Sequence, residues 1–242
     1  MTEDDRQWKG LFIVSGVLLI LTCFLSLVVA WGGRTLYASG YPPDPASYLG
    51  LVSQHEQLAS MTWSLWIVLD FISLPPMLAI YIILKRHSRS FALLGFLFCV
   101  FYAIYDVCVT ELSSLTLVRL SQVYADAATS LQQASALGAA TYAYYALPYQ
   151  TVLSFAIGPI GYLLSCVPMA MSFFGRWVAF FGAIVSVIGL LGAAAPVVPS
   201  SFFLGLCQFI CVRAIAIWSL VLGIKLLLYA VRLPAKTAQA SR

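Results

Sequence analysis

The sequence predicts an all-α, polytopic membrane helix bundle, and three observations support this prediction. Of the 242 residues, 62% are hydrophobic and only 9% are charged. The apolar residues gather in six continuous runs, each about as long as the ~20 residues that a helix needs to cross a bilayer. These runs do not alternate with period two, which argues against a membrane β-barrel. We expect one membrane domain over residues 1–242, because no stretch is left for a sizeable soluble domain.

Six transmembrane helices are expected, and a seventh is possible. The predicted spans are residues 10–31, 59–84, 91–117, 142–174, 177–195 and 202–231. The fourth is too long for a straight crossing and contains three prolines, so we expect it to be tilted or kinked. The double proline of the second span, Pro75-Pro76, is also expected to bend its helix.

Two long loops are expected, at residues 32–58 and 119–140. Within the first, residues 46–58 read as a short amphipathic helix that lies at the membrane surface and leads into the second span. The second begins with polar residues and continues as an Ala-rich stretch. Both loops lie on the same side of the membrane if six spans cross it.

The basic residues predict which side that is. The two tails and the even-numbered loops hold nine Lys or Arg residues, whereas the odd-numbered loops hold only Arg34 and Arg119. Positive charge favours the cytoplasmic side, so both termini are expected in the cytoplasm and the long loops outside. The net charge of +4 is thus explained by topology, and we expect no nucleic-acid partner.

Cysteine and histidine give no sign of a metal site or a cofactor. All six cysteines lie inside apolar runs without Cys-x-x-Cys spacing, which is typical of small core residues. The two histidines, His55 and His87, lie outside the spans. A zinc or di-iron centre is therefore not expected.

Four ionisable residues lie inside the spans, where a charge is costly and often functional. Asp70 and Arg213 are at a similar predicted depth, Asp106 lies in the outer half, and Glu111 lies nearer the outer boundary. The simplest structural interpretation pairs Arg213 with Asp70 or Asp106 as a buried ion pair. One carboxyl group is then left without a cation, which raises the alternative that these acids perform chemistry.

Aromatic residues recur near these acids and predict a lined pocket. On an α-helix, Trp63 and Trp66 share a face with Asp70, and Tyr102 shares one with Asp106. We also assign Tyr145, Tyr149 and Gln208 to the substrate-binding set. At α-helical spacing, Asp106 and Glu111 point apart by about 140°, so Glu111 is expected at the outer mouth. Such a pocket could protonate a lipophilic substrate and hold a cation against aromatic faces.

Several short runs resemble small bacterial multipass membrane proteins grouped as a domain-of-unknown-function family. The runs are ILKRHS at 83–88, ALLGF at 92–96, IGPIGY at 157–162 and GRWVAFFG at 175–182. This resemblance implies a bundle of six or seven helices and brings no activity with it. In architecture alone, the chain is also similar to the small integral-membrane terpene cyclases, which implies acid chemistry on an isoprenoid.

Three functions remain open from the sequence. The leading hypothesis is a membrane-embedded enzyme, of cyclase, isomerase or lyase type, that acts on a lipophilic, isoprenoid-like substrate by acid–base chemistry. Its expected partners are that small molecule and the lipid bilayer; the oligomeric state is open. The second hypothesis is a proton-coupled transporter or ligand-binding membrane protein. The third is a structural or accessory subunit in which the acids and Arg213 hold helices together.

Overall fold

The computed structural model describes residues 6–37, 42–198 and 201–233. Within these residues the chain forms helices and no strand. In chain order the elements are α2 (Lys9–Leu36), α3 (Pro45–Gln54), α4 (Glu56–Leu84), α5 (Arg89–Tyr105), the π-helix η1 (Asp106–Glu111), α6 (Leu112–Ala125), α7 (Ser130–Met169), α8 (Arg176–Gly192), the 3-10 turn η2 (Ala195–Val197) and α9 (Phe202–Arg232).

Six of these helical segments are long and apolar enough to cross a membrane, which confirms the predicted fold class. They are α2, α4, α5 continued through η1 and α6, α7, α8 continued through η2, and α9. The short helix α3 has ten residues, which is about half of a crossing. The architecture is that of a multi-pass integral membrane protein.

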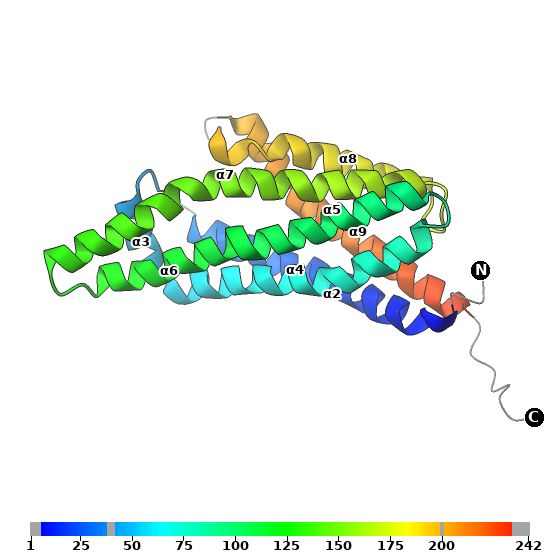
Figure 1. Cartoon of the computed structure of the whole chain (residues 1–242), viewed down its shortest axis with the longest axis horizontal. Helices are drawn as coiled ribbons and strands as arrows, with labels where there is room; N and C mark the ends of the chain where they lie inside the picture. The colour runs from blue at the N-terminus through cyan, green and yellow to red at the C-terminus, as the bar shows by residue number, and fades with distance from the viewer. Residues whose placement is uncertain (1–5, 38–41, 199–200, 234–242) are drawn as a thin grey trace, which may run out of the picture.

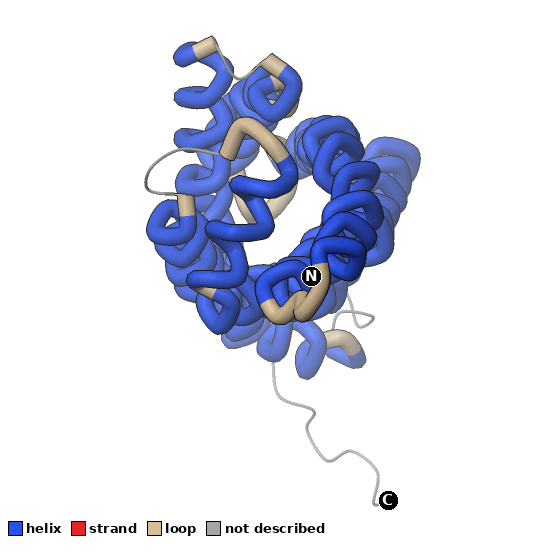
Figure 2. The backbone as a smooth tube through the Cα atoms, turned by 90° about the vertical axis from the view of Figure 1, so that its left-hand side faces the viewer, coloured by secondary structure: helices blue, strands red, loops and turns tan. Residues whose placement is uncertain are grey.

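The six spans close into a ring. Helix α2 packs against α4 and α9, α4 against α5, α5 against α7, α7 against α8, and α8 against α9. Viewed along its length, the bundle shows the helices arranged around a central axis (Figure 2). Polar side chains that point inward can therefore meet near this axis although they come from distant parts of the chain.

The two described chain ends lie at the same end of the bundle (Figure 1). There, the Lys9 Nζ donates a hydrogen bond of 2.8 Å to the carbonyl oxygen of Leu233. The α4–α5 and α7–α8 turns are at this end too, and we call it the basic end because it carries Lys9, Lys85, Arg89 and Arg176. The α6–α7 turn marks the opposite, hairpin end. That the basic end is cytoplasmic stays a prediction.

The predicted loop at 119–140 is wrong, because most of it is helical. Helix α6 runs to Ala125, and α7 begins at Ser130 with Thr129 as its N-cap. The 40 residues of α7 span about 60 Å at ~1.5 Å per residue. Alanine favours helix, and Ala136 and Ala140 are buried. Because the segment is polar, it reads as a loop in the sequence, but α6 and the start of α7 form a helical hairpin that projects from the bundle (Figure 1).

Helix α3 differs from the expected surface helix in the way it packs. Tyr48, Leu49 and Val52 are fully buried, and the helix packs against α6 and α7. Asp44 caps it by accepting hydrogen bonds from the Ser47 backbone N–H (2.9 Å) and hydroxyl (2.7 Å). These bonds lower the pKa of the Asp44 carboxyl below its usual value. Helix α3, which leads into the second span, is thus packed into the hairpin end of the bundle.

Small residues allow close helix contacts on opposite sides of the ring. A Cβ on Gly161 of α7 would lie 3.0 Å from the backbone nitrogen of Cys99 on α5, and one on Gly95 would lie 3.0 Å from the Gly161 carbonyl oxygen. Across the ring, a Cβ on Gly223 of α9 would lie 2.7 Å from the carbonyl oxygen of Gly16 on α2. Such backbone contacts are a common basis of helix association in membranes.

Candidate functional site

Three acidic side chains converge inside the ring. Asp70 comes from the middle of α4, and Asp106 and Glu111 come from the two ends of η1. Their exposed fractions are only 4%, 6% and 3%, respectively. The Asp70 carboxyl group lies beside that of Asp106, within hydrogen-bonding reach. The acidic side chains of the site therefore come from two of the six long helical segments, α4 and the segment that contains η1.

The π-helix corrects the predicted orientation of Glu111. In an α-helix, residues five apart point in different directions, but in a π-helix they are joined by the i→i+5 backbone hydrogen bond and lie above one another. Asp106 and Glu111 have this spacing within η1, and both line the same cavity. The expectation that they point apart is therefore wrong. Single π-helical turns inside longer helices are frequently found at functional sites.

Asp106 is the best-connected of the three acids. Its Oδ1 accepts a hydrogen bond of 2.6 Å from the Ser154 hydroxyl on α7. Its Oδ2 accepts a longer one, of 3.4 Å, from the Tyr102 hydroxyl one turn earlier. The ring of Tyr102 packs over Gly158, where a Cβ would come within 3.2 Å of it. Helix α7 thus holds both Asp106 and its aromatic neighbour in place.

Other polar atoms at the site lack partners within the described residues. Buried and without a hydrogen bond are Glu111 Oε2 and Trp63 Nε1. Native structures leave few buried polar groups unpaired. Two of them at one site suggest that water or a ligand completes it.

Arg213 forms neither of the predicted ion pairs. In the described part of the chain, no ion pair joins it to Asp70 or Asp106. Its Nη1 instead donates to the carbonyl oxygen of Phe209, one turn earlier, at 3.0 Å, and its guanidinium lies 3.3 Å from the centre of the Phe209 ring. Arg213 is half-buried and Arg34 is exposed. Within the described residues, the three acids thus form no ion pair with Arg213.

A cavity of about 600 Å³ lies on the hairpin side of the acids. We call it the hairpin-end cavity. Of the residues predicted from the sequence, it is lined by Trp63, Trp66, Tyr102, Asp106, Glu111, Gln208 and Arg213. Its volume is in the range of small-molecule sites. The structure thus brings seven of the ten predicted site residues to one cavity.

The other three predicted residues lie elsewhere. Asp70 is within one helical turn of Trp66 but does not line the hairpin-end cavity. Tyr145 lines an adjoining cavity of about 670 Å³, which shares Trp63 and Gln208 with the first. Tyr149 is 70% exposed on the outside of the bundle and lines neither cavity. The two tyrosines assigned to the substrate-binding set therefore lie outside the hairpin-end cavity.

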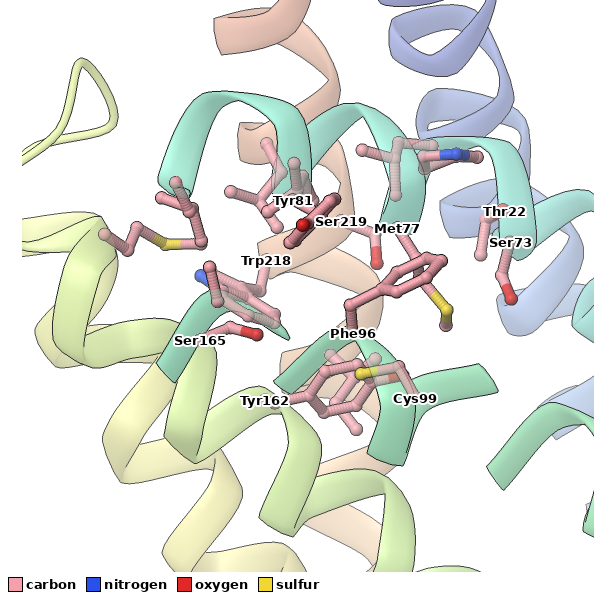
Figure 3. Close-up of a pocket in the computed structure, with 18 residues that line it drawn as sticks. Thr22, Ser73, Met77, Tyr81, Phe96, Cys99, Tyr162, Ser165, Trp218 and Ser219 are labelled. Atoms are coloured by element: carbon pink, nitrogen blue, oxygen red, sulfur yellow. The ribbon is translucent and has the colours of Figure 1, made fainter. Parts of the chain in front are cut away.

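A smaller cavity, of about 90 Å³, lies on the basic side of the acids. Figure 3 shows its labelled side chains, which converge from α2, α4, α5, α7 and α9. Its lining is mostly apolar, with Ser73, Ser165 and Tyr162 among the polar exceptions. Ser73 follows Asp70 by less than one turn and donates to its backbone carbonyl at 2.7 Å. Along α4, Asp70 thus separates the two cavities.

Sequence reasoning missed several residues of the site. Arg34 had been assigned to topology, yet it lines the hairpin-end cavity. Thr110 and Thr151 line it too, and Ser154 is the hydrogen-bond partner of Asp106. Hydroxyl groups are common in membrane helices, so the sequence gives no signal that would single out Thr110, Thr151 and Ser154. Among the described residues, no group of three or more His, Cys, Asp or Glu side chains is arranged to hold a metal ion.

The fold and the cavity define the class as an all-α, multi-pass membrane protein with a buried carboxyl cluster. Comparisons with protein-family models, with curated proteins and with solved structures found no match to this chain. The two resemblances noted in the sequence stay predictions.

Proposed function

We propose that this protein is a membrane-embedded enzyme that acts on a lipophilic, isoprenoid-like substrate by acid–base chemistry in the hairpin-end cavity. The observation that carries the proposal is the cluster of Asp70, Asp106 and Glu111, which is buried beside a cavity of about 600 Å³. Isolated ionised carboxylates are costly in such surroundings, so carboxyl groups there tend to be neutral.

The contact between Asp70 and Asp106 supplies the acid. A hydrogen bond between two carboxyl groups requires at least one proton, and proximity of two acids favours sharing it. Asp106 lines the cavity and can pass a proton to a substrate, while Asp70 behind it does not reach the cavity. We therefore assign Asp106 as the proton donor and Asp70 as a positioning residue that holds or returns the proton.

The reaction that fits this arrangement leaves the formula of the substrate unchanged. Asp106 protonates an alkene carbon or an epoxide oxygen, and the resulting carbocation rearranges or closes a ring. A neighbouring carbon then loses a proton to the carboxylate of Asp106 or Glu111. The faces of Trp66 and Tyr102, which line the same cavity, stabilise the cation by cation–π interaction. No oxidant or reductant is needed.

The test is deuterium transfer from the solvent. The protein is inserted in nanodiscs in D₂O and given geranylgeraniol or its terminal epoxide, and products are analysed by mass spectrometry. From geranylgeraniol we expect an isomerised product that carries one deuterium on carbon. From the epoxide, the added deuteron lies on the hydroxyl oxygen and exchanges with water, so the expected product is an isomer of unchanged mass. Asp106→Asn should slow the formation of both products by about 10²- to 10⁴-fold, the usual contribution of a general acid.

Asp126→Asn is the matched control, since it removes an exposed carboxyl group at the α6–α7 turn and should leave the rate unchanged. Asp70→Asn and Glu111→Gln are tested as well, each after confirming a monodisperse, helical protein. Wild-type rates in all three buried-acid variants, or no isomerised product from either probe with the wild type, would contradict the proposal.

A proton-coupled transporter is the second candidate, and one observation favours it. Along α4, Asp70 lies between Trp66, which lines the hairpin-end cavity, and Ser73, which lines the smaller cavity, as a proton-carrying acid in a transport path would. Vesicles loaded with a pH-sensitive dye distinguish the candidates. A lipophilic substrate that moves protons into the vesicle, with loss of the movement in Asp70→Asn, supports transport. Product formation without proton movement supports the enzyme.

A further inference from the structure

The hairpin-end cavity is polarised along its length. At its inner side are the carboxyl groups of Asp106 and Glu111, and nearer the bundle surface are two arginines, Arg34 and Arg213. Arg34 is in the last turn of α2, and Arg213 is in the middle part of α9. Acidic and basic side chains thus line one cavity, and within the described residues no ion pair joins them.

The two arginines come from helices α2 and α9 and line the same cavity. Arg34 adds a second positive charge to the surroundings of the Arg213 guanidinium. Within residues 6–37, 42–198 and 201–233, neither arginine forms an ion pair with a carboxylate. Two like charges at a partly buried site are unfavourable, and an anion between them would remove the repulsion. The guanidinium group is well suited to this, because its planar fork binds carboxylates and phosphates with two hydrogen bonds.

Arg213 is already held in an orientation that suits such binding. Its contacts with the carbonyl oxygen and the ring of Phe209 involve one nitrogen and one face of the guanidinium. The remaining N–H groups have no recorded partner in the described chain. Ordering the side chain before binding reduces the entropy lost when a ligand arrives.

The rest of the lining indicates what is attached to the anion. The apolar part of the lining includes Val29, Ala30, Leu147, Phe155 and Val212, and the uncharged polar part includes Thr110, Thr151 and Gln208. The apolar side chains suit a hydrocarbon chain. A ligand with an anionic head at the arginines would place its chain toward Asp106.

We infer that the hairpin-end cavity is a binding site for a single-chain amphiphile with an anionic head group, a phosphate or a carboxylate, which Arg34 and Arg213 hold. The inference rests on the proposed function in that the same cavity serves as the substrate site. It adds the class of substrate: the isoprenoid-like chain carries an acidic head, and the arginines set which part of the chain reaches Asp106.

Binding is measured without turnover, so that this inference can fail or hold independently of the proposed reaction. The probes are radiolabelled dodecyl phosphate, dodecanoate and dodecanol, which share one chain length. They are titrated into the full-length protein in nanodiscs of zwitterionic phosphatidylcholine. We expect the two anionic probes to bind at least 10-fold more tightly than the alcohol, in the wild type and in Asp126→Asn alike.

The arginine variants assign this preference to the site. Arg34→Gln and Arg213→Gln should each reduce the preference for the anionic probes to below 3-fold. Arg119→Gln is the matched control, because it removes one exposed positive charge near the same end of the bundle, outside this cavity. Arg34 is exposed, so its variant keeps the test valid if Arg213→Gln fails to fold.

Equal affinity for phosphate and alcohol in the wild type, or an equal loss of preference in Arg119→Gln, would overturn the inference. Nanodiscs that contain anionic phosphatidylglycerol identify the source of the head group. Competition by this lipid indicates a membrane lipid, and unchanged binding indicates a free amphiphile. Either result is consistent with an anion site. Preferential binding without an isomerised product from either isoprenoid probe would retain the site and reject the proposed reaction.

Discussion

The close contact between α5 and α7 predicts opposite effects for two glycines of the same helix. In Gly161→Ala, the new methyl group would lie 2.7 Å from Cys99 Sγ and 3.0 Å from Cys99 N. Carbon contacts are optimal at ~3.5–4.0 Å, so the two helices must separate by roughly 0.5 Å. Gly138→Ala meets no atom within 4 Å. Each Gly→Ala change adds at most about 1 kcal/mol to stability through helix propensity. This gain is the same in both variants, so it cancels when their free energies of unfolding are compared.

The difference between the two variants therefore isolates the overpacking, which typically costs about 1–3 kcal/mol. We expect Gly138→Ala to be slightly more stable than the wild type and Gly161→Ala to be less stable than Gly138→Ala by that amount. Unfolding in mixed micelles, titrated with sodium dodecyl sulfate and followed by far-UV circular dichroism, gives both free energies. If Gly161→Ala proved as stable as Gly138→Ala, the backbone contact between α5 and α7 would be refuted.

Two further predictions concern hydrogen bonds. Ser154→Ala leaves the buried Oδ1 of Asp106 without its 2.6 Å donor and should cost about 1–2 kcal/mol in the same unfolding assay; no loss would show that the bond does not form. At Asp44 the pKa is lowered on folding, so its contribution is present above the unfolded value of about 3.9 and is lost as pH falls through the lowered value. Amide-exchange protection of α3, corrected for intrinsic rates, should drop in that acidic range in the wild type. In Asp44→Ala it should be low at every pH, and equal protection in both proteins would contradict the role of the cap.

The sequence predicted the positions of the membrane spans well, because a continuous apolar run is enough to locate a span. Continuous apolar runs located the six crossing segments, and the ends of the second and sixth spans agree with α4 and α9 to within a few residues. It failed at 119–140, because polar and Ala-rich residues are compatible with either a loop or a helical hairpin. Packing of α7 against α3 and α6 decided between them.

The candidate site shows the same division. The sequence singled out Asp70, Asp106 and Glu111, because ionisable residues are rare and costly inside apolar spans. It did not predict their neighbours. The pairing with Arg213 rested on estimated depth, which sets position along the bundle axis but not direction around a helix.

What the sequence alone determined is the class of the protein: hydrophobicity and length require an all-α membrane bundle with acids inside it. What only the tertiary structure decided is which groups surround those acids. The π-helix brought Glu111 onto the face of Asp106, and the ring of helices brought Arg34 and Arg213 to the cavity that both acids line. The physical reason is that burial depends on one residue at a time, whereas the meeting of side chains depends on helix rotation and on partners far away in the chain.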